Sequence, residues 1–139
     1  MDWKLEVVVV PVSDIDRAKR FYADQIGFSV DHDTKVSDEV RVAQLTPPGS
    51  ACSIVLGKGI VEMAPGSLKG LQLVVSDIHA ARAHLVARGV EASDVQVFDS
   101  GSFRPSREGD ALDNVAFVYF SDPDGNAWAV QQISHRDSG

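Results

Sequence analysis

The segment Ser100–Arg107 places an aromatic side chain and two guanidinium groups within one predicted loop. Phe103 is suited to stacking on a flat ligand, and Arg104 or Arg107 to pairing with an anionic ligand. The alternative is a solvent-facing loop in which Phe103 fills a surface depression. The sequence shows no Ser-His-Asp constellation, P-loop or dinucleotide fingerprint, and Cys52 has no basic neighbour in sequence that would activate its thiol. These residue types favour ligand recognition over covalent catalysis.

A duplicated segment defines the organisation of the chain. The tetrapeptide Val12–Ile15 recurs as Val75–Ile78, an offset of 63 residues, and each copy follows an apolar run and precedes a helical pattern. The helical patterns end at Gly27 and Gly89, an offset of 62, so the second helix is one residue shorter. A repeat of this length in 139 residues predicts two similar modules with a ligand pocket between them.

Periodicity and turn residues predict the same element order, β-α-β-β-β, in both halves, and hence an α+β fold. In the first half we expect a helix over residues 14–25, capped by Ser13, and strands over 5–12, 28–33, 39–46 and 51–57. In the second half we expect a helix over 77–88 with Val86 facing inward, a long loop over 99–112, and strands over 71–75, 90–98, 115–120 and 127–133. The expected domain is 1–139, with module one at about 4–58, a linker at 59–69, module two at about 70–133 and a flexible tail at 134–139.

Composition limits the possible partners. Apolar residues make up 44% of the chain and charged residues 24%, the balance of an ordinary globular protein. The net charge of −7 argues against a nucleic-acid backbone as partner, and no apolar run is long enough to suggest a membrane span. With a single cysteine and no signal-peptide pattern, we expect a reducing, cytoplasmic location.

The segment Pro11–Ala18, with Phe21-Tyr22 and Gly27-Phe28 after it, and the turn Asp122–Asn126 resemble the vicinal oxygen chelate superfamily of glyoxalases, bleomycin resistance proteins and extradiol dioxygenases. The resemblance covers about residues 5–133. It implies two βαβββ modules that form curled mixed sheets around a cleft, and a homodimer.

Family enzymes hold a divalent metal in that cleft with His, Gln and Glu ligands. Carried over onto this chain, the ligand positions fall at Val7, Val55, Gly70 and Ala129. None of these side chains can bind a metal. Glu6 is expected on the opposite face of its strand, and none of the histidines, His32 included, is expected on a cleft-facing strand position. We therefore expect no metal and no other cofactor.

With Val7 facing the cleft, strand alternation predicts the remaining lining. The lining is mostly small and apolar, which suits a flat or apolar organic molecule oriented by a few hydrogen bonds. Gln72 and Gln131 either contact the ligand or bond neighbouring backbone groups. The predicted ligand-binding residues are Val9, Ser53, Gln72, Phe103, Arg104 and Gln131.

The resulting hypothesis is a bleomycin-resistance-like, metal-independent protein that binds a small organic molecule, aromatic or cationic, and sequesters it without converting it. The alternative is an enzyme of the same superfamily, a lyase, isomerase or dioxygenase with non-standard or absent metal ligands. The sequence assigns no catalytic residue, and it favours the binding protein over the enzyme.

Overall fold

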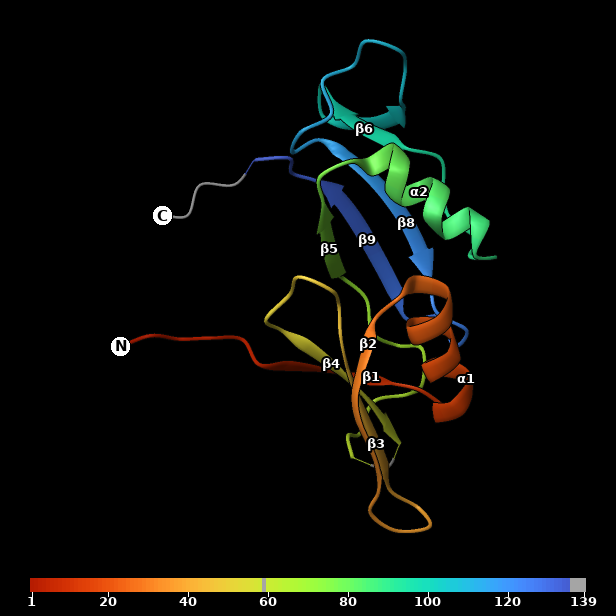
Figure 1. The fold of residues 1–139 in the computed structure, drawn as a ribbon. Helices are drawn as coiled ribbons and strands as arrows, with labels where there is room; N and C mark the ends of the chain where they lie inside the picture. Colours follow the sequence, from red (N-terminus) through yellow and green to blue (C-terminus); the bar gives the residue numbers. More distant parts are fainter. Residues whose placement is uncertain (59, 136–139) are drawn as a thin grey trace. The chain divides into compact units, whose positions relative to one another are not determined.

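The fold is α+β and contains two mixed sheets, as predicted. The computed structural model describes residues 1–58 and 60–135, and of Lys58 only the backbone (Figure 1). The chain divides into two compact units. The first comprises Met1–Lys69 and the turn Asp122–Asn126, and the second comprises Gly70–Ser121 and the chain from Ala127 onward. Among the described residues, no helix is long and apolar enough to cross a membrane.

Within residues 1–58, one four-stranded sheet with the strand order β1-β4-β3-β2 forms the first unit. β1 is parallel to β4, and the other neighbours are antiparallel. The strands match the predicted runs with ends moved by up to two residues. They are β1 (Val7–Pro11), β2 (Ser29–Lys35), β3 (Arg41–Thr46) and β4 (Ser53–Lys58).

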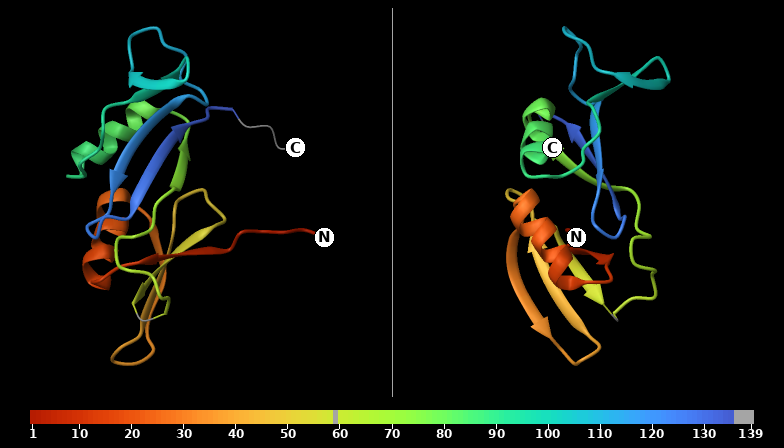
Figure 2. Two further views of the ribbon diagram at one scale, coloured as in Figure 1. Left: turned by 180° about the vertical axis from the view of Figure 1, so that it is seen from behind. Right: turned by 90° about the vertical axis from the view of Figure 1, so that its right-hand side faces the viewer.

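Helix α1 (Ile15–Lys19) continues directly into η1 (Arg20–Ile26), which has π-helical hydrogen bonding, and α1 packs against β3 and β4 (Figure 2). Alternate residues of the strands point toward this helix and are buried with it, because one face of a half-buried strand is apolar. The core of this unit includes Val10, Ala43, Leu45, Ile54 and Leu56 from the strands and Ile15, Ala18, Phe21 and Tyr22 from the helix.

The first helix differs from prediction at its start and in its interior. Asp14, not Ser13, is the N-cap, because its carboxylate accepts a hydrogen bond from the Arg17 amide (3.0 Å). The first helix has one residue more than the second, and the wider π-helical turn accommodates this extra residue. Gly27 ends the helix with φ +106°, as predicted from its freedom to adopt the left-handed region.

Among the described residues of the second unit, a five-stranded sheet with the order β5-β9-β8-β6-β7 repeats the topology of the first unit and adds one strand. β5 (Leu71–Val75) is parallel to β9 (Ala127–Gln132), and β8 (Ala116–Ser121) is antiparallel to β9. Helix α2 (Ile78–Ala87) packs against β8 and β9 through Ile78 and Leu85. Val86 is exposed, so its predicted inward orientation is wrong.

The predicted loop over 99–112 is wrong, because part of it is a strand. β6 (Gln96–Asp99) and β7 (Ser102–Pro105) form a hairpin, drawn in teal in Figure 1. Ser100 and Gly101 both have positive φ (54° and 89°), which is the requirement of a two-residue type I′ turn. The strand predicted over 90–98 is correspondingly short. Val90 and Val95 are buried but precede β6.

The carboxylate of Asp113 holds the chain that follows β9. Ser134 donates from its amide to Asp113 (3.0 Å) and from its hydroxyl to the same carboxylate, so the start of the predicted flexible tail is anchored. Residues 136–139 of that tail lie outside the described residues.

In the first unit, Asp122 organises the turn Asp122–Asn126 and bonds Tyr22 of η1 (2.7 Å).

Candidate functional site

One face of the second sheet gathers most of the predicted binding residues. In neighbouring strands, side chains of residues in register point to the same face. Gln72 of β5 is in register with Ala129 of β9, which is opposite Tyr119 of β8. The next row joins Val74, Gln131, Phe117 and Gln96, and Phe98 and Phe103 follow on the hairpin. We call this set the aromatic face: Gln72, Val74, Gln96, Phe98, Phe103, Phe117, Tyr119, Ala129 and Gln131.

Four rings of the aromatic face contact one another. Phe103 meets Phe98, Phe117 and Tyr119 edge to face, with ring centroids 5.2, 5.6 and 6.2 Å apart. Phe117 and Tyr119 are parallel, with an interplanar angle of 7°. Phe98, Phe103 and Tyr119 remain 45%, 49% and 38% exposed. Aromatic groups normally bury most of their area, so these exposed rings offer stacking surface to a partner.

Burial raises the pKa of the Tyr119 phenol further above its ordinary value of 10.0, so the group is protonated at neutral pH with or without this shift. It therefore adds a neutral hydrogen-bonding group to the ring cluster, and no charge.

An amide pair occupies the β5–β9 side of the aromatic face. Gln72 Nε2 donates to Gln131 Oε1 (2.5 Å), and Gln131 Nε2 donates to the backbone carbonyl of Asn114 (2.9 Å). The two glutamines predicted as candidates are thus brought together. The sequence left open whether the two glutamines contact a ligand or bond neighbouring backbone groups. In the structure Gln131 bonds a backbone carbonyl and Gln72 bonds Gln131. Contact of either side chain with a ligand stays a prediction.

Arg104 lies on the other side of the hairpin from Phe103, in register with the buried Val97. Its guanidinium donates to Asp99 (3.1 Å) and, through two nitrogens, to both oxygens of Asp110 (2.9 Å each). These bonds hold the pKa of Asp110 well below its usual range and raise that of Arg104. Because its guanidinium is already bonded to Asp99 and Asp110, Arg104 stabilises the hairpin and is less available to an anionic ligand than expected.

The first sheet carries the other predicted residues on one face. Val7 is in register with Ser53, and Val9 with Val55. The latter row continues through Gln44 of β3 to His32 of β2, whose Nε2 lies 3.1 Å from Gln44 Oε1. The expectation that His32 lies away from this face is therefore wrong.

A β-bulge in β2 explains why His32 lies on this face. The register of β2 shifts between Val30 and His32, which leaves Asp31 as the extra residue. Asp31 accepts a hydrogen bond from the Thr46 hydroxyl, which in turn lies 2.6 Å from the buried Ser53 Oγ. Asp31 and His32 therefore reach the same face although they are neighbours in sequence. We call the set Val7, Val9, Asp31, His32, Gln44, Thr46, Ser53 and Val55 the polar face.

The family resemblance assigned four positions of this chain to metal ligands, and the structure shows where they lie. Val7 and Val55 belong to the polar face, Ala129 belongs to the aromatic face, and Gly70 has φ +89°. In the part of the chain that the structure describes, no three His, Cys, Asp or Glu side chains are grouped to hold a metal ion. Metal independence stays a prediction.

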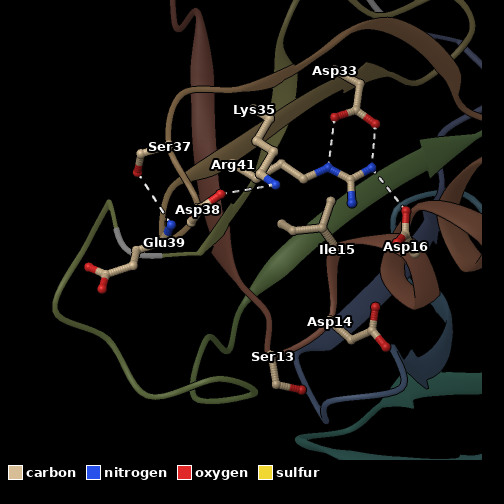
Figure 3. A pocket seen from close by; sticks show the side chains of 10 residues that line it. All are labelled: Ser13, Asp14, Ile15, Asp16, Asp33, Lys35, Ser37, Asp38, Glu39 and Arg41. Carbon is tan, nitrogen blue, oxygen red and sulfur yellow. Dashed lines mark hydrogen bonds and ion pairs between the residues drawn. The ribbon is translucent and has the colours of Figure 1, made fainter.

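A polar hollow of about 630 Å³ lies in the first unit between the start of α1 and the loop that joins β2 to β3 (Figure 3). Arg41 donates to both oxygens of Asp33 (2.9 and 2.6 Å) and pairs with Asp16 (2.9 Å). The hydrogen bonds from Arg41, and then from Lys19, hold the pKa of Asp33 well below its usual range. Because its central charges pair with one another, we assign no ligand to this hollow.

The comparisons agree with this architecture. A family model described as the Glyoxalase/Bleomycin resistance protein/Dioxygenase superfamily matches residues 4–130. The chain therefore belongs to this superfamily, as the sequence motifs predicted. A search of curated proteins found no match.

Solved structures supply relatives over almost the whole chain. TnmS3, an antibiotic binding protein from Streptomyces sp. CB03234, is 34% identical over 96% of this chain and 98% of that chain, with a TM-score of 0.74. A glyoxalase/bleomycin resistance protein from the same organism is also 34% identical, over 93% and 100%, with a TM-score of 0.70. A superfamily member from Sphaerobacter thermophilus DSM 20745 is 26% identical over 94% and 98%, with a TM-score of 0.72.

Proposed function

We propose that the protein binds a small organic molecule with a flat unsaturated portion on the aromatic face and sequesters it without converting it. The observation that carries this proposal is the cluster of four rings joined through Phe103, three of them more than one-third exposed, beside an amide pair. The antibiotic binding named for TnmS3 supports a ligand of antibiotic type.

The ring geometry favours a flat ligand. Phe103 stands nearly perpendicular to the parallel Phe117 and Tyr119, at 85° and 84°. A planar ring system can stack on one of these rings while its edge meets another, which is a favourable arrangement of ring quadrupoles. Each such pair contributes about 0.5–1.5 kcal/mol beyond the burial of area.

A thermal-shift screen of flat aromatic antibiotics, followed by calorimetric titration of the hits, tests this function. Phe103→Ala removes the ring that contacts the three others, and should weaken binding by about 2 kcal/mol, roughly thirtyfold. Trp3→Ala is the matched control, because Trp3 is an exposed aromatic residue outside the aromatic face. Equal affinities of wild type and Phe103→Ala for every hit would refute the assignment of this face.

An enzyme is the second candidate, and the polar face is the observation that favours it. The bulge places the Asp31 carboxylate and the His32 imidazole on one face beside Gln44 and two hydroxyls. Imidazole and carboxylate are the usual side chains of general acid–base catalysis. Mass spectrometry of each hit after incubation separates the candidates. Unchanged masses support sequestration, and a product that His32→Ala fails to form supports the enzyme.

A homodimer and a cytoplasmic location remain parts of this proposal that come from the family resemblance and the single cysteine. Light scattering coupled to size-exclusion chromatography tests the dimer directly. A mass of one chain at micromolar concentration would refute it.

A further inference from the structure

We infer that Gln72 is a hydrogen-bond acceptor of fixed direction, and that the ligand of the aromatic face carries a hydroxyl or N–H donor toward it. This inference rests on the proposed function and narrows its ligand class.

The carbonyl of Asn114 fixes the first amide. A backbone carbonyl oxygen can only accept hydrogen bonds, so the Gln131 group that faces it at 2.9 Å must be the NH₂ group. The opposite orientation would place two acceptor oxygens against each other and leave both without a donor. Gln131 Oε1 therefore faces Gln72.

Asn114 is itself held in an unusual conformation. Its φ of +70° lies in the left-handed region, which non-glycine residues rarely adopt. Its amide donates to the Gln132 carbonyl (2.8 Å), which fixes the local backbone. Backbone strain of this kind is often retained where it positions a functional group.

The orientation of the Gln131 amide determines the orientation of the Gln72 amide. Because Gln131 presents its oxygen, Gln72 must present its NH₂ group, as the 2.5 Å contact from Nε2 to Oε1 shows. Gln72 Oε1 then points away from the pair. Within the described residues no donor is assigned to this oxygen, and the residue is exposed on β5. The amide pair thus ends in an acceptor on the same face as the rings.

A ligand that lies over both the rings and Gln72 must stack on a ring and also suit the Gln72 oxygen, which can only accept a hydrogen bond. Tyr119 lies in the same row of the sheet as Gln72, with Ala129 between them. A flat ring system stacked on Tyr119 with an acceptor at its β5 edge, such as a methyl ether, would place two oxygens together at Gln72. A ligand with a phenol or N–H at that edge would instead complete the hydrogen bond. The Gln72 oxygen therefore selects hydroxylated or amino-substituted aromatic molecules over their alkylated analogues.

Two probes that differ only in this donor test the inference. 2-Naphthol carries a phenolic donor that is neutral at pH 7, as tyrosine is, and 2-methoxynaphthalene lacks that donor. We expect wild-type protein to bind 2-naphthol about fivefold more tightly, the value of one net hydrogen bond. Titrations followed by naphthalene fluorescence and by chemical shifts of the Phe103 region give both affinities.

Three variants locate the preference. Gln72→Met removes the acceptor at similar volume and should make the affinities for the two probes equal. Gln131→Met frees the Gln72 amide to turn and should also abolish the preference, which identifies Gln131 as a positioning residue. Gln25→Met, in η1 of the first unit, is the matched control and should keep the preference.

The outcomes separate this inference from the proposed function. If both probes bind wild type equally, or if Gln72→Met keeps the preference, the acceptor assignment is overturned while the ring cluster stands as a binding surface. If neither probe perturbs the aromatic face, the proposed function fails and the inference falls with it.

Discussion

Replacing Asp122 with alanine should lower the free energy of unfolding of the first unit more than any surface substitution. Five hydrogen bonds between described residues end on this one carboxylate, which is 5% exposed. Oδ1 accepts the backbone amides of Asp124, Gly125 and Asn126 at 2.9–3.0 Å. Oδ2 accepts the Tyr22 hydroxyl (2.7 Å) and the Asn126 side-chain amide (2.8 Å).

The magnitude follows from the donors left behind. Tyr22 and Asn126 are fully buried, so the Tyr22 hydroxyl and two Asn126 N–H groups, one of the backbone and one of the side chain, would lose their bond to this carboxylate out of reach of water. Each unsatisfied buried donor is destabilising by about 1–3 kcal/mol. The more accessible amides of Asp124 and Gly125 can turn to water and contribute less. We expect a loss of about 4 kcal/mol, a large fraction of the roughly 5–15 kcal/mol that stabilises a domain.

Urea unfolding followed by circular dichroism, together with melting curves, measures this loss. A change of about 4 kcal/mol should lower Tm by roughly 12–16 °C in a chain of this size. Tyr22→Phe removes only one of the bonds and should lose about 1 kcal/mol. Asp38→Ala is the control, because the Asp38 side chain is 99% exposed. A loss below about 1 kcal/mol for Asp122→Ala would refute the reasoning.

Three further predictions concern charge and backbone. The pKa of Asp33 is depressed, so its contribution to stability is present above the ordinary value of 3.8 and is lost as the pH falls below it. Asp33→Asn should therefore lower Tm at neutral pH, and the gap to wild type should close in acid; a gap independent of pH would contradict this. Gly101→Val places a β-branched residue at φ +89° and should lose about 1–2 kcal/mol and reduce amide protection in the hairpin. Unchanged protection in β6 and β7 would contradict that. Gly27→Ala, at φ +106° with open space around it, should lose about 1 kcal/mol in urea unfolding from backbone strain alone, and a neutral result would count against that strain.

The architecture could be predicted because local sequence and fold agree in most elements. The β-branched run before Ser13, the helical spacing after it and the glycine at 27 each point to the element that forms. Strand alternation also placed Gln72 and Gln131 on one face, and they contact each other. Periodicity and turn chemistry act over a few residues, so they can be read from one sequence.

The hairpin turn, the β-bulge and the direction of the amide pair depend on backbone conformations that cannot be deduced from residue type. Serine seldom adopts positive φ, so the sequence does not indicate a tight turn at Ser100 and Gly101 and predicts a loop where Phe103 lies on a strand. The bulge at Asp31 shifts the register of β2, so the sequence does not show that His32 shares a face with Gln44. The direction of the amide pair likewise depends on the φ of Asn114.

The π-helical segment η1 has a consequence for comparing the two halves of the chain. The caps Asp14 and Asp77 are 63 residues apart, whereas the glycines that end the helices, Gly27 and Gly89, are 62 apart. An alignment of the halves must therefore open its gap in the second helix, opposite the extra residue of the first helix, and not in a loop. A length change absorbed within one helical turn leaves the pairing of the strands before and after it undisturbed, so the two sheets keep the same strand order although their helices differ in length.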